Sequence, residues 1–173
     1  MKLIEFDGVE FKIADEALLV RPIRELFQQD KSKKKEDFWK QISYLWFMCD
    51  PRSSYQYLTD ADERAKEIKK QEGLGEGWEP SELLKEAMDI YRTMTITTSA
   101  ILLEGMRKGI DKLSRFLSTT DFTDKTVASM TSALRQIPEL AKALVEAEKS
   151  LAKDFATDDK ARGNTTKALG EDL

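Results

Sequence analysis

The sequence contains no histidine and only one cysteine, Cys49. Without histidine, the chain cannot use Ser–His or Cys–His nucleophilic catalysis, histidine metal ligands or an imidazole proton shuttle. A single cysteine cannot form a disulfide within the chain, which is typical of proteins from reducing compartments. These two shortages remove most of the familiar chemistry of enzyme sites, so we predict no catalytic residue, no metal site and no cofactor.

Long apolar runs and an excess of basic residues are also missing. The longest uncharged run, residues 93–103, is about half the ~20 residues that a membrane-spanning helix needs. The N-terminus lacks the basic segment and apolar run of a signal peptide. A formal charge of -4 is the wrong sign for a nucleic-acid partner. We therefore expect no membrane partner and no export by a signal peptide, and the composition disfavours nucleic acid as a partner.

The residues that are present indicate a folded, helix-rich protein. Hydrophobic residues make up 40% and charged residues 35% of 173 residues, enough for one domain with a normal core. We predict a mainly α-helical bundle with one long helix, an N-terminal β-hairpin and an extended C-terminal tail. The expected parts are a hairpin arm over 1–13, a helical domain over 14–156 with a flexible joint near 73–79, and a polar tail over 157–173.

Alternation of polar and apolar residues on both sides of Asp7-Gly8 predicts the hairpin. Asp-Gly favours a two-residue type I′ turn, which would place Phe6 opposite Val9 and Ile4 opposite Phe11. An isolated hairpin is marginally stable in water, so its apolar face should pack on helices of the chain or on another chain.

Apolar spacing and helix breakers predict five helical segments, over residues 15–29, 36–49, 60–71, 80–117 and 123–155. Pro22 must kink the first of them or lie near its start, and Pro80 should occupy the first turn of the fourth. Thr59 is the expected N-cap of the third.

The segment 80–117 would be longer than about 50 Å as one helix, beyond the width of a small globule. Part of it must project, bend or find a partner. The β-branched, hydroxyl-rich TMTITTS sequence allows a break, and Gly105 and Gly109 indicate close helix packing or a bend.

The last predicted helix should be interrupted or restarted at Pro138. Its second half has a heptad-like seam, which would suit an antiparallel partner within the chain or another subunit. The seam consists of Leu140, Leu144, Ala147, Leu151 and Phe155.

Nearly half of the aromatic residues lie between Phe38 and Tyr57. The helix over 36–49 is apolar nearly all round, so it is either the core element alone or a core element that another molecule also covers. Tryptophan and tyrosine are favoured at interfaces, whereas base stacking would need interleaved basic residues. Cys49 lies on the core face and reads as a small buried hydrophobe. The candidate interaction residues are Phe6, Phe11, Trp39, Tyr44, Trp46, Phe47, Arg52, Tyr55 and Tyr57.

The turn after this helix, Asp50-Pro51-Arg52-Ser53, is predicted to be a rigid elbow. Pro51 restricts φ, and the side chain of Asp50 or Ser53 should accept hydrogen bonds from nearby amides. Arg52 could instead pair with an acid across an interface.

A resemblance rests on these residues. The aromatic helix ends in D-P-R-S-S-Y and is followed by a short charged helix beginning T-D-A-D-E-R. Over Phe38 to Gly73 this arrangement resembles small structural proteins of tailed bacteriophages, including those of crAss-like phages. The resemblance carries no catalytic residues. It implies a virion component near the neck or portal, or attached to the capsid, made in the host cytoplasm.

The function expected from sequence is therefore structural and not enzymatic. The implied partners are other virion subunits, including further copies of the chain in a symmetric homo-oligomer. One alternative is an intracellular assembly chaperone or adaptor that uses the aromatic helix transiently. Another is a small histidine-free enzyme or regulator.

Overall fold

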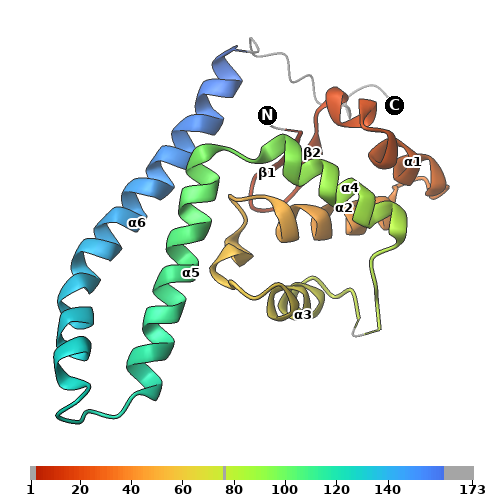
Figure 1. Cartoon of the computed structure of the whole chain (residues 1–173). Helices are drawn as coiled ribbons and strands as arrows, with labels where there is room; N and C mark the ends of the chain where they lie inside the picture. The colour runs from red at the N-terminus through yellow and green to blue at the C-terminus, as the bar shows by residue number, and fades with distance from the viewer. Residues whose placement is uncertain (1–2, 76, 162–173) are drawn as a thin grey trace. The chain divides into compact units, whose positions relative to one another are not determined.

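The structure, a computed structural model, describes residues 3–75 and 77–161 (Figure 1). Two strands are followed by helices throughout these residues, which confirms the predicted mainly α fold with an N-terminal hairpin and one long helix. The elements are β1 (Ile4–Phe6), β2 (Phe11–Ile13), a 3₁₀ helix (Asp15–Leu19), α1 (Arg21–Gln29), α2 (Glu36–Cys49), a second 3₁₀ helix (Ser54–Tyr57), α3 (Ala61–Gln71), α4 (Glu82–Thr95), α5 (Thr98–Thr119) and α6 (Val127–Ala161).

Contacts within the chain divide it into two compact units. Unit 1 comprises Met1–Ile96 and Phe155–Leu173, and unit 2 comprises Thr97–Asp154. The division between α4 and α5 falls in the hydroxyl-rich segment, while the glycine segment expected to be a joint lies inside unit 1. Each unit has its own pattern of burial and is described separately.

The hairpin has a different register from the expected one. Phe6 pairs with Phe11 and Ile4 pairs with Ile13, so residues 7–10 form the loop. The predicted two-residue turn, with Phe6 opposite Val9 and Ile4 opposite Phe11, is wrong.

Asp7 explains the longer loop. Its Oδ1 atom accepts hydrogen bonds from the backbone N–H groups of Val9 and Glu10, at 3.0 and 2.9 Å. This side-chain turn uses the amide of Val9, which the expected register needed for strand pairing. Because the register moves by two residues, the alternation is preserved and Phe6 and Phe11 still share one face.

The core of unit 1 is built around α2. This helix packs against both α3 and α4, and α4 also packs against α1. Its boundaries match the prediction, and the rings of Phe6 and Phe11 lie on Trp46 and Phe47. The hairpin therefore packs on a helix of its own chain.

The connection from α1 to α2 is held by side chains. Pro22 lies in the first turn of α1, after the 3₁₀ helix, so it begins the helix and does not kink it. Buried Asp30 accepts hydrogen bonds from the backbone N–H of Phe38 at 3.0 Å and of Ser32 at 2.8 Å. Lys35 has a left-handed φ of 53° and donates from Nζ to the carbonyl of Phe27 at 3.1 Å. Lys35, at the end of the lysine-rich run over residues 31–35, thus has a structural role.

Two predicted helix starts need correction. The N-cap of α3 is Asp60, not Thr59, because the Asp60 carboxylate accepts from the amides of Asp62 and Glu63. The N-cap of α4 is Ser81, whose Oγ accepts from Leu84 N at 3.2 Å. Pro80 precedes this cap and is outside the helix. In both cases a short polar side chain captures an amide that the first helical turn leaves unpaired.

The segment 80–117 is not one helix, since it breaks between α4 and α5. Thr97 has extended backbone angles and caps α5 by accepting from Ala100 N at 3.1 Å. At the end of α4, the Thr95 hydroxyl donates to the carbonyl of Tyr91 at 2.9 Å. Hydroxyl groups that bond locally to the backbone compete with the helix, and this accounts for a break within TMTITTS.

Unit 2 is an antiparallel pair formed by α5 and the part of α6 up to Asp154 (Figure 1). The hydroxyl groups of Ser99 and Ser150 are 3.1 Å apart, and Arg107 donates to Glu148 Oε1 at 3.1 Å. The side chains buried in this unit are Ala100, Leu103, Met130, Ala133, Ala147 and Leu151. Antiparallel pairing within the chain is therefore shown for part of the predicted seam.

The long helix is α6, which continues through Pro138 from Val127 to Ala161. The predicted interruption at Pro138 is wrong. The proline removes one backbone hydrogen bond, and the segment after it, residues 139–153, is rich in the strong helix formers alanine, leucine, glutamate and lysine, which favour continuation of the helix. The helix also includes residues 157–161 of the predicted tail, and the remainder, 162–173, lies outside the described residues. None of the helices in the described part of the chain has the length and hydropathy needed to cross a membrane.

Candidate functional site

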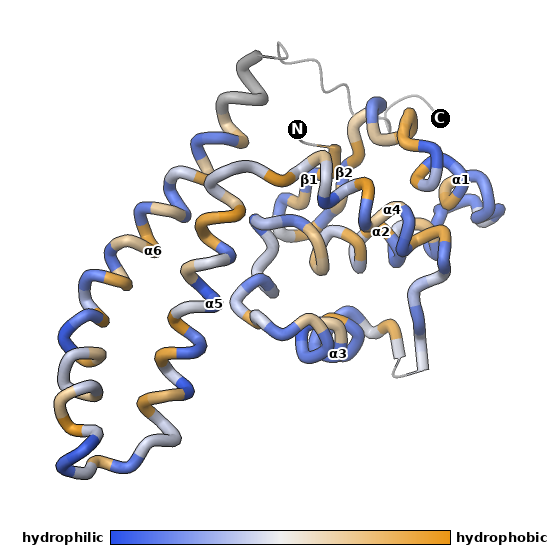
Figure 2. Tube along the Cα trace, in the orientation of Figure 1, coloured by the Kyte–Doolittle hydropathy of each residue, from blue (hydrophilic) through white to orange (hydrophobic). Residues whose placement is uncertain are grey.

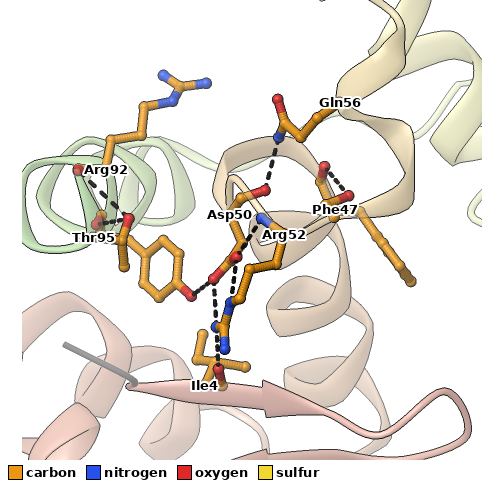
Figure 3. Close-up of polar contacts among 9 residues, drawn as sticks. Ile4, Phe47, Asp50, Arg52, Gln56, Arg92 and Thr95 are labelled. Carbon is orange, nitrogen blue, oxygen red and sulfur yellow. Dashed lines mark hydrogen bonds and ion pairs between the residues drawn. The ribbon is translucent and has the colours of Figure 1, made fainter. Parts of the chain in front are cut away.

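The most strongly interacting polar group of unit 1 is the carboxylate of Asp50, directly after α2 (Figure 3). Its side chain has no exposed surface. Arg52 donates from Nε to Oδ1 at 2.8 Å and from a terminal nitrogen to Oδ2 at 2.7 Å. The hydroxyl of Tyr91 on α4 donates to the same Oδ2 at 2.6 Å. Paired hydrogen bonds to one carboxylate give this contact a defined geometry.

Arg52 connects further parts of unit 1. It donates to the backbone carbonyl of Ile4 in β1 at 3.0 Å (Figure 3). Its guanidinium carbon lies 4.3 Å from the ring centroid of Phe155, which also belongs to unit 1. We call Asp50, Arg52 and Tyr91 the buried junction, because they join α2, α4 and the hairpin.

The elbow after α2 is held as the sequence predicts. The backbone N–H of Arg52 donates to Asp50 Oδ1 at 2.9 Å, and Tyr55 N donates to Ser53 Oγ at 3.2 Å. The Ser53 hydroxyl donates to the carbonyl of Phe47 at 2.9 Å. Gln56 Nε2 donates to the carbonyl of Asp50 at 3.0 Å (Figure 3). The carbonyl of Phe47 in the last turn of α2 and that of the C-cap residue Asp50 are thereby satisfied.

A cluster of aromatic rings lies beside the junction. Phe6 and Phe11 stack at 4.5 Å, and both contact Phe47 edge-on at 5.5 Å. Trp46 and Tyr55 lie 5.3 and 5.0 Å from Phe47. Edge-to-face packing of this kind adds stabilisation beyond the area that the rings bury.

The structure places the nine candidate interaction residues unequally. Tyr44, Trp46 and Phe47 are buried in the core of unit 1. Phe6, Phe11, Trp39, Arg52 and Tyr55 are half-buried, and all of them have contacts within unit 1. Tyr57 is 64% exposed. Hence the aromatic helix is a core element, and among the nine candidates only Trp39 on this helix is partly exposed, while Tyr57, in the second 3₁₀ helix, is the most exposed of them.

One buried donor lacks a partner. Among the side chains that the structure describes as buried, the indole N–H of Trp46 makes no hydrogen bond. It lies next to Phe6, Phe11 and Phe47, so apolar rings occupy much of its surroundings. Leaving this donor unpaired lowers the stability that Trp46 contributes.

Burial suppresses the reactivity of the nucleophilic groups in unit 1. It raises the pKa of the Cys49 thiol to about 12, so the thiol is protonated at neutral pH. Burial, and next the charge of Asp50, raise the pKa of Tyr91 well above its usual value. Burial alone would lower the pKa of Arg52, but the hydrogen bond and charge of Asp50 raise it overall. Arg52 therefore stays protonated at neutral pH, and Tyr91 stays neutral.

Metal ligands do not gather in the described residues. Within 3–75 and 77–161, no group of three or more His, Cys, Asp or Glu side chains is placed to hold a metal ion. The acids at the start of α3 instead belong to the helix start: Asp60 is the N-cap, and Asp62 and Glu63 lie in the first turn.

The sequence did not predict one member of the junction, Tyr91, or the contact of Arg52 with the carbonyl of Ile4. The signal that was available is the elbow itself, because a buried aspartate after an apolar helix requires a cationic or hydroxyl partner. The sequence left open that Arg52 pairs with an acid across an interface; in the structure it pairs with Asp50 of the same chain.

Comparisons of the chain with protein-family models, with curated proteins and with solved structures found no match.

Proposed function

We propose that this chain is a non-enzymatic structural component of a tailed-phage virion, close to the neck or portal or attached to the capsid, and that it acts by assembling with other virion subunits. The observation that carries the assembly role is the exposed apolar surface of unit 2. Large apolar side chains that recur in exposed positions along two helices are typical of a surface that binds a partner. The large apolar residues exposed in unit 2 are Ile101, Leu102, Phe116, Phe122, Val127, Leu134, Ile137 and Val145.

The polar groups of unit 1 support a structural role over catalysis. Its buried carboxylate is fully engaged by Arg52 and Tyr91, and its one thiol is protonated at neutral pH. Catalytic acids and nucleophiles need pKa values close to the working pH. The shifts at Cys49 and Tyr91 move in the opposite direction, away from neutrality.

The assignment to a phage particle rests on the resemblance over Phe38 to Gly73. In the structure that stretch contains most of α2, the elbow and α3, which together form the centre of unit 1. A compact unit 1 and a helical pair with exposed apolar side chains suit a building block that is held in place by contacts with its neighbours.

Mass spectrometry of purified particles tests this proposal. We expect the chain at a constant copy number relative to the major capsid protein, in particles washed at high salt. A non-structural protein of the same phage serves as the control for carry-over from the lysate. Finding the chain in infected cells but not in particles would contradict the structural role and favour the assembly chaperone.

A further inference from the structure

The α5–α6 pair of unit 2 has two different faces, and two pairs of hydrogen-bonded residues mark them. Ser99 and Ser150 meet on one face, and Arg107 and Glu148 meet on the other. Leu103, 1% exposed, lies between Ser99 and Arg107 on the helical wheel and points into the seam between the helices. We name the two sides the serine face and the arginine face.

On the serine face, α5 is apolar and α6 is acidic. Starting from Ser99, α5 residues at heptad spacing fall on this side, and they are Leu102, Met106, Gly109, Leu113 and Phe116. The α6 residues that precede Ser150 at helical spacing are Glu146, Ala143 and Glu139. Leu102 and Phe116 are exposed, so α6 leaves this part of the α5 stripe uncovered.

On the arginine face, the roles of the helices are exchanged. Helical spacing from Glu148 places Val145, Ile137 and Leu134 of α6 on this side, and all three are exposed. Spacing from Arg107 places Glu104 and Asp111 of α5 beside them. Each face therefore combines an apolar stripe on one helix with carboxylates on the other, and Figure 2 shows apolar residues recurring along both helices.

The outer edges of the pair are basic. Lys108, Lys112 and Arg115 lie on the side of α5 away from α6, and Lys142 and Lys149 lie on the corresponding side of α6. Each apolar stripe is thus bordered by basic residues on its outer side and by acidic residues on its inner side. A copy related by a two-fold axis parallel to the helices lays the same stripe against it and places its basic edge over these acids. The faces are self-complementary in hydrophobicity and in the order of their charges, and Lys108 and Arg115 of the edge also pair with Glu104 and Asp111 of their own helix, at 2.6 and 3.2 Å.

The glycines of α5 add room for a close approach. A Cβ atom built on Gly105 or Gly109 would meet nothing within 4 Å, so neither glycine is explained by packing within the chain. The expected close packing at these positions is absent from the described residues, and the backbone beside them is open to a second helix.

From these observations we propose that copies of this chain associate with one another through the serine and arginine faces of their α5–α6 pairs. Because the two faces lie on opposite sides of the pair, pairing through one leaves the other exposed, and assembly continues beyond a dimer. This inference rests on the proposed function, since it names further copies of the chain as the partner in the assembly.

Sedimentation velocity of the full-length chain over a wide concentration range tests the inference. We expect wild-type species larger than dimers. Leu102→Asp on the serine face and Leu134→Asp on the arginine face should each stop assembly at dimers, and the double variant should be monomeric. Each should weaken its contact by roughly a hundredfold, because it puts an unpaired carboxylate into an apolar interface.

Ile101 provides a matched control next to Leu102. The two side chains are 57% and 56% exposed, but Ile101 lies on the outer side of α5, beside the basic edge. Ile101→Asp should leave assembly unchanged, and circular dichroism should show equal helix content for all variants. Assembly that persists in the double variant, or an equal loss with Ile101→Asp, would overturn the inference.

The outcomes also separate this inference from the proposed function. A wild-type chain that is monomeric at every concentration and is nevertheless a component of purified particles would mean that another virion protein covers these faces. The self-association would then be wrong while the structural role held. A chain that assembles as expected and is absent from particles would mean that the self-association is right and the structural role in the particle is wrong.

Discussion

Both units contain amphipathic helices, but they bury their apolar side chains to different extents. In unit 1, α2 is surrounded by α3, α4 and the hairpin, so residues on nearly all its sides are buried. In unit 2, α5 and α6 share one seam, in which alanines and a few larger side chains are buried. Unit 1 therefore obtains its stability from contacts of its own, whereas unit 2 keeps much of its apolar surface exposed.

The difference teaches that amphipathicity alone does not decide whether a residue is core. A helix with a broad apolar stripe needs covering on more than one side, and a single antiparallel neighbour covers only part of the stripe. The exposed leucines and valines of unit 2 follow from having too few helices to cover them.

The largest expected effect comes from breaking the buried junction. Arg52→Ala leaves the carboxylate of Asp50 buried with only Tyr91 as a side-chain donor from another element, and should cost about 3–5 kcal/mol of unfolding free energy. Urea unfolding followed by tryptophan fluorescence measures this. The exposed ion pair of Arg21 with Glu25 gives a control, since Arg21→Ala should cost less than about 1 kcal/mol. Equal losses in the two variants would show that the junction contributes no more than a surface pair.

A comparison of two phenylalanines sharpens the contrast between the units. Phe38 on α2 is fully buried against Phe27 and Trp39, and Phe38→Ala should cost about 3–5 kcal/mol. Phe116 on α5 is 36% exposed, and Phe116→Ala should cost under about 1.5 kcal/mol in the monomer. The same urea measurement, made at a concentration where the chain is monomeric, checks both values. A loss at Phe116 as large as that at Phe38 would mean that unit 2 has a closed core of its own.

The hydroxyl of Tyr91 should have a smaller effect than Arg52. Tyr91→Phe keeps the ring and removes the 2.6 Å hydrogen bond to Asp50, so it should cost about 1.5–3 kcal/mol. Tyr55→Phe is a suitable control, because its hydroxyl donates to Glu72 at an exposed site. Equal losses of unfolding free energy in the two variants would show that the buried hydrogen bond from Tyr91 to Asp50 stabilises the fold no more than the exposed one from Tyr55 to Glu72.

Much of the fold could be predicted from local signals. Helix α2 has the predicted boundaries because Asp50-Pro51 ends it and because its apolar residues have helical spacing. The break at Thr97 could be foreseen only as one option, since hydroxyl-rich segments can either cap a helix or continue it. The hairpin register could not be predicted from Asp7-Gly8. An aspartate at this position suits both the two-residue type I′ turn and the longer loop, in which its carboxylate accepts hydrogen bonds from the amides of Val9 and Glu10.

The candidate site was less predictable because its partners are far apart in sequence. The pairing of Asp50 with Arg52 is local, but Tyr91 and Ile4 reach the junction only through the packing of α4 and β1. Likewise, the aromatic composition of α2 could not tell a core from an interface. A core helix and an interface helix can have the same aromatic composition, and they differ only in how many elements of their own chain surround them.

A pH-dependent effect is expected at the start of α2. The hydrogen bond from Phe38 N to the Asp30 carboxylate lowers its pKa to about 2, below the usual value of about 4. A lowered folded-state pKa means that the stabilisation is complete above about pH 4 and is lost as the pH falls through about 2. Asp30→Asn should therefore have a lower urea midpoint than the wild type at pH 7, and the difference between the two midpoints should become smaller near pH 2. A difference between the two proteins that is independent of pH would contradict this role for the carboxylate.

The smallest expected effect has the opposite sign and comes from Gly109 in unit 2. An alanine Cβ there meets no atom within 4 Å, and the helix gains about 0.5–1 kcal/mol because glycine is the poorer helix former. Gly109→Ala should thus raise the unfolding free energy of the monomer, measured by urea at low concentration. Gly73→Ala is the control in unit 1, where a φ of +66° makes any side chain unfavourable and stability should fall. A stabilising substitution on an open helix face means that the glycine is not required by the fold of the single chain.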